Sequence, residues 1–276
     1  MLEVCMVTYE GEELIERAVR SLAQLWSGVG LSIHDNSPTP LALSGVRSVA
    51  AELGIPLRVE RCGGNCGFAS ACNSLVNGSG ADYVLFLNPD AELLNWPGEH
   101  LLASNAIVGP VVTDESGRIL ATWGTRRSIL EEFMQRWARA RPRMPLGRGY
   151  VSGAAFLIPR AIFIGLGGFD ETFFMYYEDI DLCLRANESG ILVKVEPRWR
   201  VRHVGGHAAN ADRAGALIRS YDAATYFFAK HGRNVQLYRF LCRIDANIKL
   251  ALYRLVPGRR SWVPAIRQLR EHLAKG

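Results

Sequence analysis

Three carboxylates fall within four positions of this chain, directly after a pair of tyrosines. Glu178, Asp179 and Asp181 follow Tyr176 and Tyr177, and an apolar run of helical spacing continues beyond them. Carboxylates at a helix start beside aromatic surface are candidates for proton transfer, because burial and dipoles shift their pKa values. Acids in a first helical turn also complement the helix dipole and cap free N–H groups. The cluster alone therefore leaves a catalytic and a structural role open.

Polar side chains also end three predicted strands that precede this cluster. Apolar runs at 2–7, 31–34, 57–60 and 83–87 alternate with helical patterns at 12–25, 46–53 and 69–76. This alternation predicts an α/β fold, with an open, mainly parallel sheet and helices on both faces. Ligands of such sheets bind beyond the carboxyl ends of the strands. The polar groups at these ends are Thr8, Tyr9, Asp35, Asn36, Asn88 and Asp90. Asp and Asn also terminate strands for conformational reasons, so the argument rests on three ends together.

A glycine-rich loop, 63–67, precedes the predicted helix at 69–76. Its backbone N–H groups are suited to a phosphate. The loop matches neither G-x-G-x-x-G nor the P-loop pattern, which disfavours a dehydrogenase or an ATPase.

The second half of the chain carries further strand and helix patterns. Strands are predicted at 107–112, 118–120, 150–158, 191–195 and 199–204, and a helix at about 179–188. Small residues at the centre of 150–158 permit close approach of backbone or ligand. Residues 126–149 are rich in Arg and contain two prolines, which predicts an acceptor-facing or solvated loop.

Composition indicates an ordinary globular chain. Of 276 residues, 49% are apolar and 21% charged, and no apolar run reaches the roughly 20 residues of a spanning helix. The N-terminus lacks the features of a signal peptide, so a cytoplasmic location is expected. The cysteines show no zinc-finger spacing and are expected to be free thiols. They are Cys5, Cys62, Cys66, Cys72, Cys183 and Cys242.

The positive charge is concentrated at the C-terminal end. Residues 237–276 hold nine Arg or Lys and two acids, a net +7, which leaves −2 for residues 1–236 of a chain whose total is +5. Basic residues alternate with apolar ones at helical spacing over 237–255, which is typical of a helix on an anionic membrane. A helix packed on the body, or in a homodimer, with a basic outer face explains the pattern equally well. No nucleic-acid partner is expected.

The combined order of motifs resembles family 2 of the nucleotide-sugar glycosyltransferases. The motifs are Val7-Thr8-Tyr9, Asp35-Asn36-Ser37, Gly67-Phe68-Ala69 with Asn73, Asn88-Pro89-Asp90-Ala91, Ser152-Gly153-Ala154, Gly167-Gly168-Phe169-Asp170-Glu171, residues 177–185 and His203. The chain looks most like bacterial rhamnosyltransferases of surface-polysaccharide synthesis. The resemblance implies a GT-A fold over residues 1–212, with a nucleotide-binding half at about 1–105 and an acceptor-binding half at about 106–212. Residues 213–276 then form a helical, basic extension.

The resemblance also implies roles for individual residues. Asp90 and His203 would hold Mg²⁺ or Mn²⁺ at the donor diphosphate, and Asp179 would be the general base. On a helix, Glu178 and Asp181 share a face while Asp179 points about 100° away from Glu178, so we expect Glu178 to orient the acceptor and Asp181 to anchor the helix. The residues expected to line the nucleotide-sugar pocket are Thr8, Tyr9, Asp35, Asn36, Gly67, Phe68, Asn73, Asn88, Asp90, Ser152 and Gly153.

The implied reaction is an inverting transfer from a nucleotide sugar, with dTDP-rhamnose as the first candidate, to a glycan or lipid-linked acceptor at the inner face of the membrane. The family's Asp-x-Asp is reduced here to Asn88-Pro89-Asp90, which leaves one carboxylate for the metal. A lone base with a cation suits single displacement, whereas a retaining glycosidase needs two carboxyl groups about 5–5.5 Å apart. The alternatives are another nucleotide-sugar enzyme, such as a nucleotidyltransferase, and a non-catalytic nucleotide- or glycan-binding protein.

Overall fold

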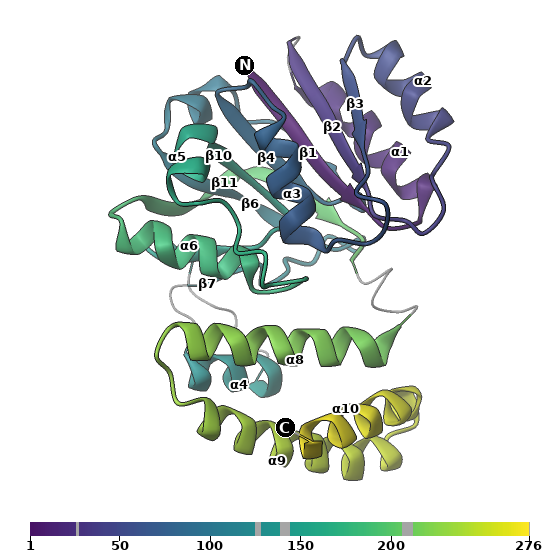
Figure 1. Ribbon diagram of the computed structural model, residues 1–276, viewed down its shortest axis with the longest axis vertical. Helices are drawn as coiled ribbons and strands as arrows, with labels where there is room; N and C mark the ends of the chain where they lie inside the picture. Colours follow the sequence, from purple (N-terminus) through teal and green to yellow (C-terminus); the bar gives the residue numbers. More distant parts are fainter. Residues whose placement is uncertain (26–27, 125–127, 139–143, 206–211, 276) are drawn as a thin grey trace. The chain divides into compact units, whose positions relative to one another are not determined.

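The computed structural model describes residues 1–25, 28–124, 128–138, 144–205 and 212–275 (Figure 1). The chain forms two compact units. The first consists of Met1–Thr172 and Glu178–Gly205, and the second of Phe173–Tyr177 and Gly206–Gly276. The predicted boundary at 212/213 adjoins residues 206–211, which lie outside the described residues. The predicted halves of 1–212 stay a prediction.

The first unit is built on a mixed sheet with the strand order β3-β2-β1-β4-β10-β6-β11-β5. The strands at one side of the sheet pair in parallel, β3 with β2, β2 with β1 and β1 with β4. β6 and β11 are also parallel, while β10 runs antiparallel between β4 and β6. The main strands are β1 (Leu2–Thr8), β2 (Val29–Asp35), β3 (Leu57–Glu60), β4 (Tyr83–Leu87), β5 (Ala91–Leu93), β6 (Ala106–Thr113), β10 (Ala155–Pro159) and β11 (Leu192–His203). The predicted α/β class and mainly parallel sheet are confirmed.

Helices cover both faces of this sheet because its strands are apolar on both sides. In β1, Leu2, Val4 and Met6 belong to one core cluster, and Cys5 and Val7 to another. This alternation is the period of two that a strand imposes on its side chains. The first cluster includes residues of α1 (Glu12–Ser21) and α2 (Ser44–Glu52), and the second includes residues of α3 (Phe68–Asn77), α5 (Arg160–Gly165) and α6 (Glu178–Glu188).

Several predicted elements have different bounds in the structure. The strand predicted at 150–158 is interrupted at 152–154, which separates β9 (Tyr150–Val151) from β10. The strands predicted at 191–195 and 199–204 are one strand, β11, with a register shift between Glu196 and Arg200. Residues 118–120 contribute one isolated bridge, between Thr113 and Ile119. A helix, α4 (Ile129–Ala138), lies in the segment predicted as a loop. The short elements are η1 (Leu22–Gln24), η2 (Glu99–Ala103), β7 (Trp123–Gly124) and β8 (Leu146–Gly147).

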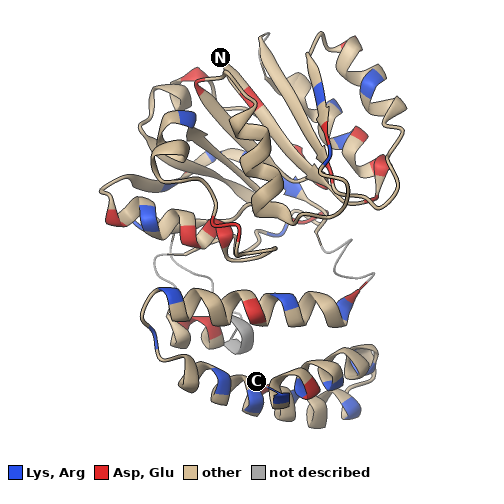
Figure 2. Cartoon of the chain, in the orientation of Figure 1, with Lys and Arg blue, Asp and Glu red and all other residues tan. Residues whose placement is uncertain are grey.

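The second unit consists largely of helices α8 (Arg213–Lys230), α9 (Val235–Leu255) and α10 (Val263–Lys275), with η3 (Pro257–Trp262) before α10. Aromatic side chains form its interior, where the rings of Tyr221 and Tyr238 stack with centroids 5.8 Å apart. Residues Phe173–Tyr177 belong to this unit because the Phe173 ring packs 4.9 Å from Tyr226 and the Tyr177 ring 5.3 Å from Phe227. Lys and Arg recur along these helices (Figure 2).

Candidate functional site

Thr8 and Asp35 end the neighbouring strands β1 and β2 in register with each other, and both are buried. The Asp35 carboxylate accepts hydrogen bonds from the N–H groups of Ser37 (2.9 Å) and Leu41 (3.0 Å), and Arg61 Nε lies 3.3 Å from Oδ2. Burial raises the pKa of Asp35, but the hydrogen bonds and the guanidinium lower it further, so the net shift is downward. Asp35 is thus a fixed, ionised acceptor at the end of β2.

Asn36 connects this strand end to the glycine-rich loop. Its backbone N–H donates to Thr8 O (2.8 Å), and its side-chain Nδ2 donates to Gly67 O (3.0 Å). Gly67 has φ 86°, a value that favours glycine, and α3 begins directly after it. No side chain caps the start of α3, so its first N–H groups are oriented to receive an anionic group.

Gly153 brings the small-residue turn, the α3 start and the acidic helix together. Its N–H donates to Asp179 Oδ2 at 2.6 Å. A Cβ added at Gly153 would lie 3.5 Å from Asp179 Oδ2 and 3.7 Å from the Phe68 ring. Ser152 orders the same turn, since its Oγ accepts from the N–H of Ala154 (3.3 Å). The candidate base therefore lies directly beside Gly153, in the turn expected to border the donor.

Asn88, Asp90 and His203 meet at the end of β4, next to the same turn. Asn88 N donates to Ala154 O (2.9 Å), and Asn88 Nδ2 lies 3.5 Å from His203 Nε2. His203 Nε2 is 3.0 Å from Asp90 Oδ1, and both side chains are largely buried. Burial raises the pKa of Asp90, but the hydrogen bond and charge of His203 lower it more, and the net shift is downward.

This carboxylate–imidazole pair fits a hard divalent cation. Octahedral Mg²⁺ binds its ligands at about 2.0–2.1 Å, which places neighbouring ligand atoms about 2.9 Å apart. The observed 3.0 Å between Asp90 Oδ1 and His203 Nε2 matches that spacing. Carboxylate oxygen, as in Asp90, suits Mn²⁺ as well as Mg²⁺. Asp90 and His203 would together hold one divalent ion.

The three acids of α6 have different environments. Asp179 is partly exposed, whereas Glu178 (5% exposed) and Asp181 (0%) are buried. Asp181 forms an ion pair with Arg185 (2.8 Å), which also donates to Gly168 O. Burial first, and then the Asp179 charge, raise the pKa of Glu178 well above its usual value. Glu178 Oε2 has no hydrogen-bond partner among the described residues. Glu178 is thus buried beside Asp179, and its expected role toward the acceptor stays a prediction.

Two other residues expected in the pocket, Tyr9 and Asn73, lie outside the group of contacts at the strand ends. Tyr9 is 43% exposed and follows the end of β1. Asn73 is engaged elsewhere, since its Nδ2 donates to Phe169 O and Glu171 Oε1, both at 2.9 Å, and its Oδ1 accepts from Phe169 N. Asn73 therefore positions the loop around Phe169, and its contact with a nucleotide stays a prediction.

The sequence did not indicate two further groups at this edge. Arg61 pairs with Asp35, and its Nη2 also donates to Ser37 O (2.6 Å). Cys62 and Cys66 lie close to His34, and burial raises the pKa of Cys66 to about 11. These residues are separated along the chain by a helix and a strand, so only the pairing of β2 with β3 brings them together.

Comparison with known proteins identifies the family. Residues 3–165, more than half of the chain, match the family model described as glycosyl transferase family 2. The chain belongs to glycosyl transferase family 2. The predicted family is confirmed. The family match includes the ends of β1, β2 and β4 and stops before α6.

Relatives of this glycosyltransferase include two named rhamnosyltransferases. The N-acetylglucosaminyl-diphospho-decaprenol L-rhamnosyltransferase of Mycobacterium tuberculosis is 28% identical over 83% of this chain and 83% of its own. The rhamnosyltransferase WbbL of Escherichia coli is 27% identical over 46% of this chain and 53% of its own. The mannosyltransferase PcManGT of Pyrobaculum calidifontis, solved with GDP-Man and Mn²⁺, shares the fold with a TM-score of 0.54. That match has 16% identity and covers 97% of this chain and 84% of that one.

Proposed function

We propose that this glycosyltransferase transfers rhamnose from dTDP-rhamnose to a lipid-linked saccharide during cell-surface polysaccharide synthesis. The two named relatives are rhamnosyltransferases, and the acceptor in one of their names is a diphospho-decaprenol-linked sugar. The main structural support for transferase chemistry is the hydrogen bond between Gly153 and Asp179, because it holds a carboxylate next to the residues at the strand ends.

We assign the strand-end residues to the donor. Asp35, Asn36 and Thr8 bind the base and ribose, and hydrogen bonds with Ser37 and Gly67 already hold Asp35 and Asn36 in place. Gly67 and Phe68 lie along the nucleotide, with the α3 start near its phosphates. Tyr9, Ser152 and Gly153 border the base and the sugar, and Asn73 supports the site through the Phe169 loop.

Asp90 and His203 hold the divalent cation, with Asn88 beside them. When bound, the cation neutralises negative charge on the departing nucleoside diphosphate. Asp179 takes the proton of the attacking acceptor hydroxyl, and a single displacement inverts the anomeric centre. The Gly153 N–H holds the Asp179 carboxylate in place. Glu178 acts as a positioning residue behind Asp179, because its own carboxyl is buried.

We also propose that α9 binds an anionic membrane surface. The helix leaves large apolar side chains exposed along one face: Leu237, Phe240, Ile244, Ile248, Leu252 and Leu255. Their spacing of three and four residues forms one continuous stripe. The other face packs inward through residues such as Tyr238, Cys242 and Leu250.

The positive charge of residues 237–276 favours an anionic partner. Arg243 and Arg254 are exposed and border the apolar stripe, and residues 237–276 carry a net +7. Apolar side chains flanked by cations suit an anionic bilayer interface, where each basic residue adds about 1 kcal/mol. No helix among the described residues is both long and apolar enough to span a bilayer.

A nucleotide-sugar panel tests the transferase proposal. Thermal unfolding is measured with dTDP-, UDP- and GDP-sugars, each with and without Mn²⁺, and nucleoside diphosphate release is measured with a lipid-linked saccharide. We expect dTDP-rhamnose to give the largest rise in Tm, together with acceptor-dependent release of dTDP. Stabilisation without release would indicate a binding protein. No stabilisation by any nucleoside diphosphate would contradict the proposal.

Vesicle sedimentation tests the membrane proposal separately. We expect wild-type protein to bind phosphatidylglycerol vesicles and not phosphatidylcholine vesicles. Phe240→Ser with Leu252→Ser should weaken binding by at least about tenfold, since each buried side chain contributes about 1.5–3 kcal/mol. Leu146→Ser, at a 92% exposed residue of the first unit, is the matched control. Concentration-dependent dimerisation lost in the α9 variant, without vesicle binding, would assign the stripe to a second copy.

A further inference from the structure

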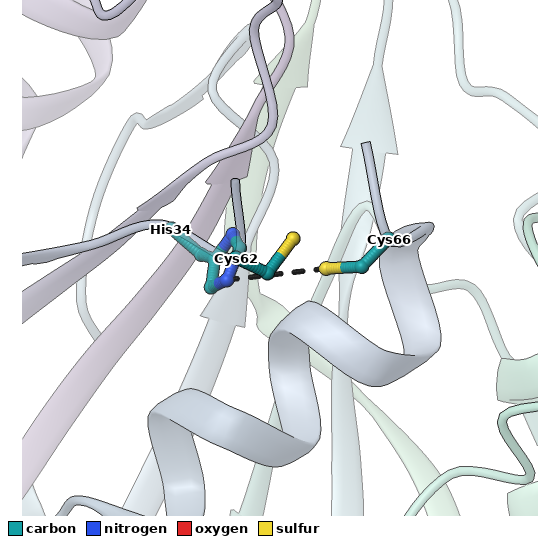
Figure 3. A group of neighbouring side chains, drawn as sticks. All are labelled: His34, Cys62 and Cys66. Carbon is teal, nitrogen blue, oxygen red and sulfur yellow. Dashed lines mark hydrogen bonds between the residues drawn. The ribbon is translucent and has the colours of Figure 1, made fainter. Parts of the chain in front are cut away.

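Two cysteines and a histidine converge at the end of β2. His34 is the penultimate residue of β2, and Cys62 and Cys66 lie in the loop that follows β3. One ligand atom from each lies within 4.8 Å of the others, and Cys66 Sγ is 3.9 Å from His34 Nε2. Figure 3 shows the Cys66 thiol directed toward the imidazole, with Cys62 beside them. All three side chains are therefore available to one small ligand.

The spacing of these atoms fits a tetrahedral metal. Zn²⁺ binds thiolate sulfur at about 2.3 Å and imidazole nitrogen at about 2.0–2.1 Å, so its ligand atoms lie roughly 3.5–3.8 Å apart. The observed separations exceed this range by about 1 Å or less, a shift that the loop carrying Cys62 and Cys66 can supply. Neither cysteine is in a disulfide.

The surroundings suit a soft cation as well. His34 is 2% exposed, so its imidazole lies in a site largely shielded from water. The nearby Asn36 Oδ1 accepts from Cys66 Sγ at 3.3 Å and lies 3.9 Å from Cys62 Sγ. His34 Nδ1 has no hydrogen-bond partner among the described residues, although it is buried. One imidazole and two thiols form the donor set that zinc prefers over magnesium.

We propose that His34, Cys62 and Cys66 bind one Zn²⁺, with Asn36 Oδ1 or a water molecule as the fourth ligand. Binding replaces two thiol protons by the metal, so no oxidant is needed. The site is separate from the Asp90–His203 pair, whose oxygen and nitrogen donors suit a harder ion. It adjoins the donor pocket, because Asn36 also donates to Gly67 O and Arg61 pairs with Asp35. Zinc would therefore restrain the loop that borders the nucleotide.

Metal titration of the full chain tests this site without a transferase assay. Chelator-treated, reduced protein is titrated with Zn²⁺ against a chromophoric competitor, and with Co²⁺ while the visible absorption is followed. We expect one equivalent of Zn²⁺ and a tetrahedral Co²⁺ spectrum with a sulfur-to-metal charge-transfer band. Cys62→Ser and Cys66→Ser should each weaken Zn²⁺ binding by at least about 100-fold, because each removes a direct ligand.

Two control variants test whether Zn²⁺ binds specifically at this site. Cys242→Ser removes a thiol of the second unit, and Asp90→Ala removes the harder site; both should bind Zn²⁺ as the wild type does. Cys62 is exposed, so its variant is expected to fold, which circular dichroism verifies. Absence of stoichiometric binding by the wild type, or unchanged binding in both cysteine variants, would overturn the proposal. Formation of a Cys62–Cys66 disulfide in reducing buffer would overturn it too.

Discussion

Asp181→Ala should destabilise the protein while leaving the chemistry almost intact. Asp181 is fully buried and pairs with Arg185, whose guanidinium also donates to backbone carbonyls of the loop after α5. Breaking a buried ion pair costs about 3–5 kcal/mol. The Arg185 side chain is 21% exposed, so we expect solvent to reduce the loss to about 2–3 kcal/mol.

This loss translates into a measurable change in melting. At about 2–4 °C per kcal/mol for a domain of this size, Tm should fall by about 4–12 °C. The kcat measured well below the new Tm should stay within about a factor of three of the wild type, because the side chain has no exposed surface for a substrate.

The Asp181–Arg185 double-mutant cycle is the control for this prediction. Asp181→Ala combined with Arg185→Ala should lose less stability than the two single losses added together, since the pair is coupled. Calorimetry gives the stabilities, and dTDP release gives the activity. An Asp181→Ala protein with unchanged Tm and no turnover would show that the roles of Asp179 and Asp181 are wrongly divided.

Four further substitutions probe neighbouring groups. The pKa of Glu178 is raised in the folded state, so its contribution to stability is present below the unfolded pKa and is lost as pH rises through the folded pKa. Glu178→Gln should therefore have a higher Tm than the wild type at about pH 8, and its Tm should depend less on pH. A lower Tm of the variant at about pH 8 would contradict this. Asp90→Ala and His203→Ala should each abolish the Mn²⁺-dependent part of the dTDP-induced Tm shift, and an undiminished shift would remove them as ligands. Asn73→Ala should cost about 1–3 kcal/mol in denaturant unfolding through its lost hydrogen bonds to the Phe169 loop, whereas unchanged stability with weakened donor binding would favour a direct nucleotide contact.

The sequence predicted the sheet and its site edge well because strand periodicity is local. Each of β1, β2 and β4 is a short apolar run that ends in polar residues, and these are near neighbours in the sheet. The small-residue turn at 152–154 was less visible, since small residues are compatible with a strand as well as a turn. The single strand β11 was also divided in prediction, because Pro197 normally interrupts pairing.

Contacts between distant segments were beyond sequence reasoning. The helical wheel separated Asp179 from Glu178 and Asp181, but it does not show how deeply Glu178 is buried. The resemblance assigns Asn73 to the nucleotide, and no local pattern indicates its hydrogen bonds to Phe169 and Glu171. The His34 cluster was missed for the same reason, since its zinc-like geometry depends on a strand pairing and not on cysteine spacing.

Donor binding and turnover, measured together in Asp179→Asn, test the assignment of the catalytic base. The amide oxygen can still accept from the Gly153 N–H, and the substitution loses the contact of the second Asp179 oxygen with the neighbouring Ile180 N–H (2.7 Å). We therefore expect the site to keep its shape and its nucleotide-sugar affinity. The kcat should fall by at least about 100-fold, because an amide cannot take the acceptor proton. Turnover within a few-fold of the wild type, in a variant that binds the donor normally, would contradict the assignment of Asp179 as the base.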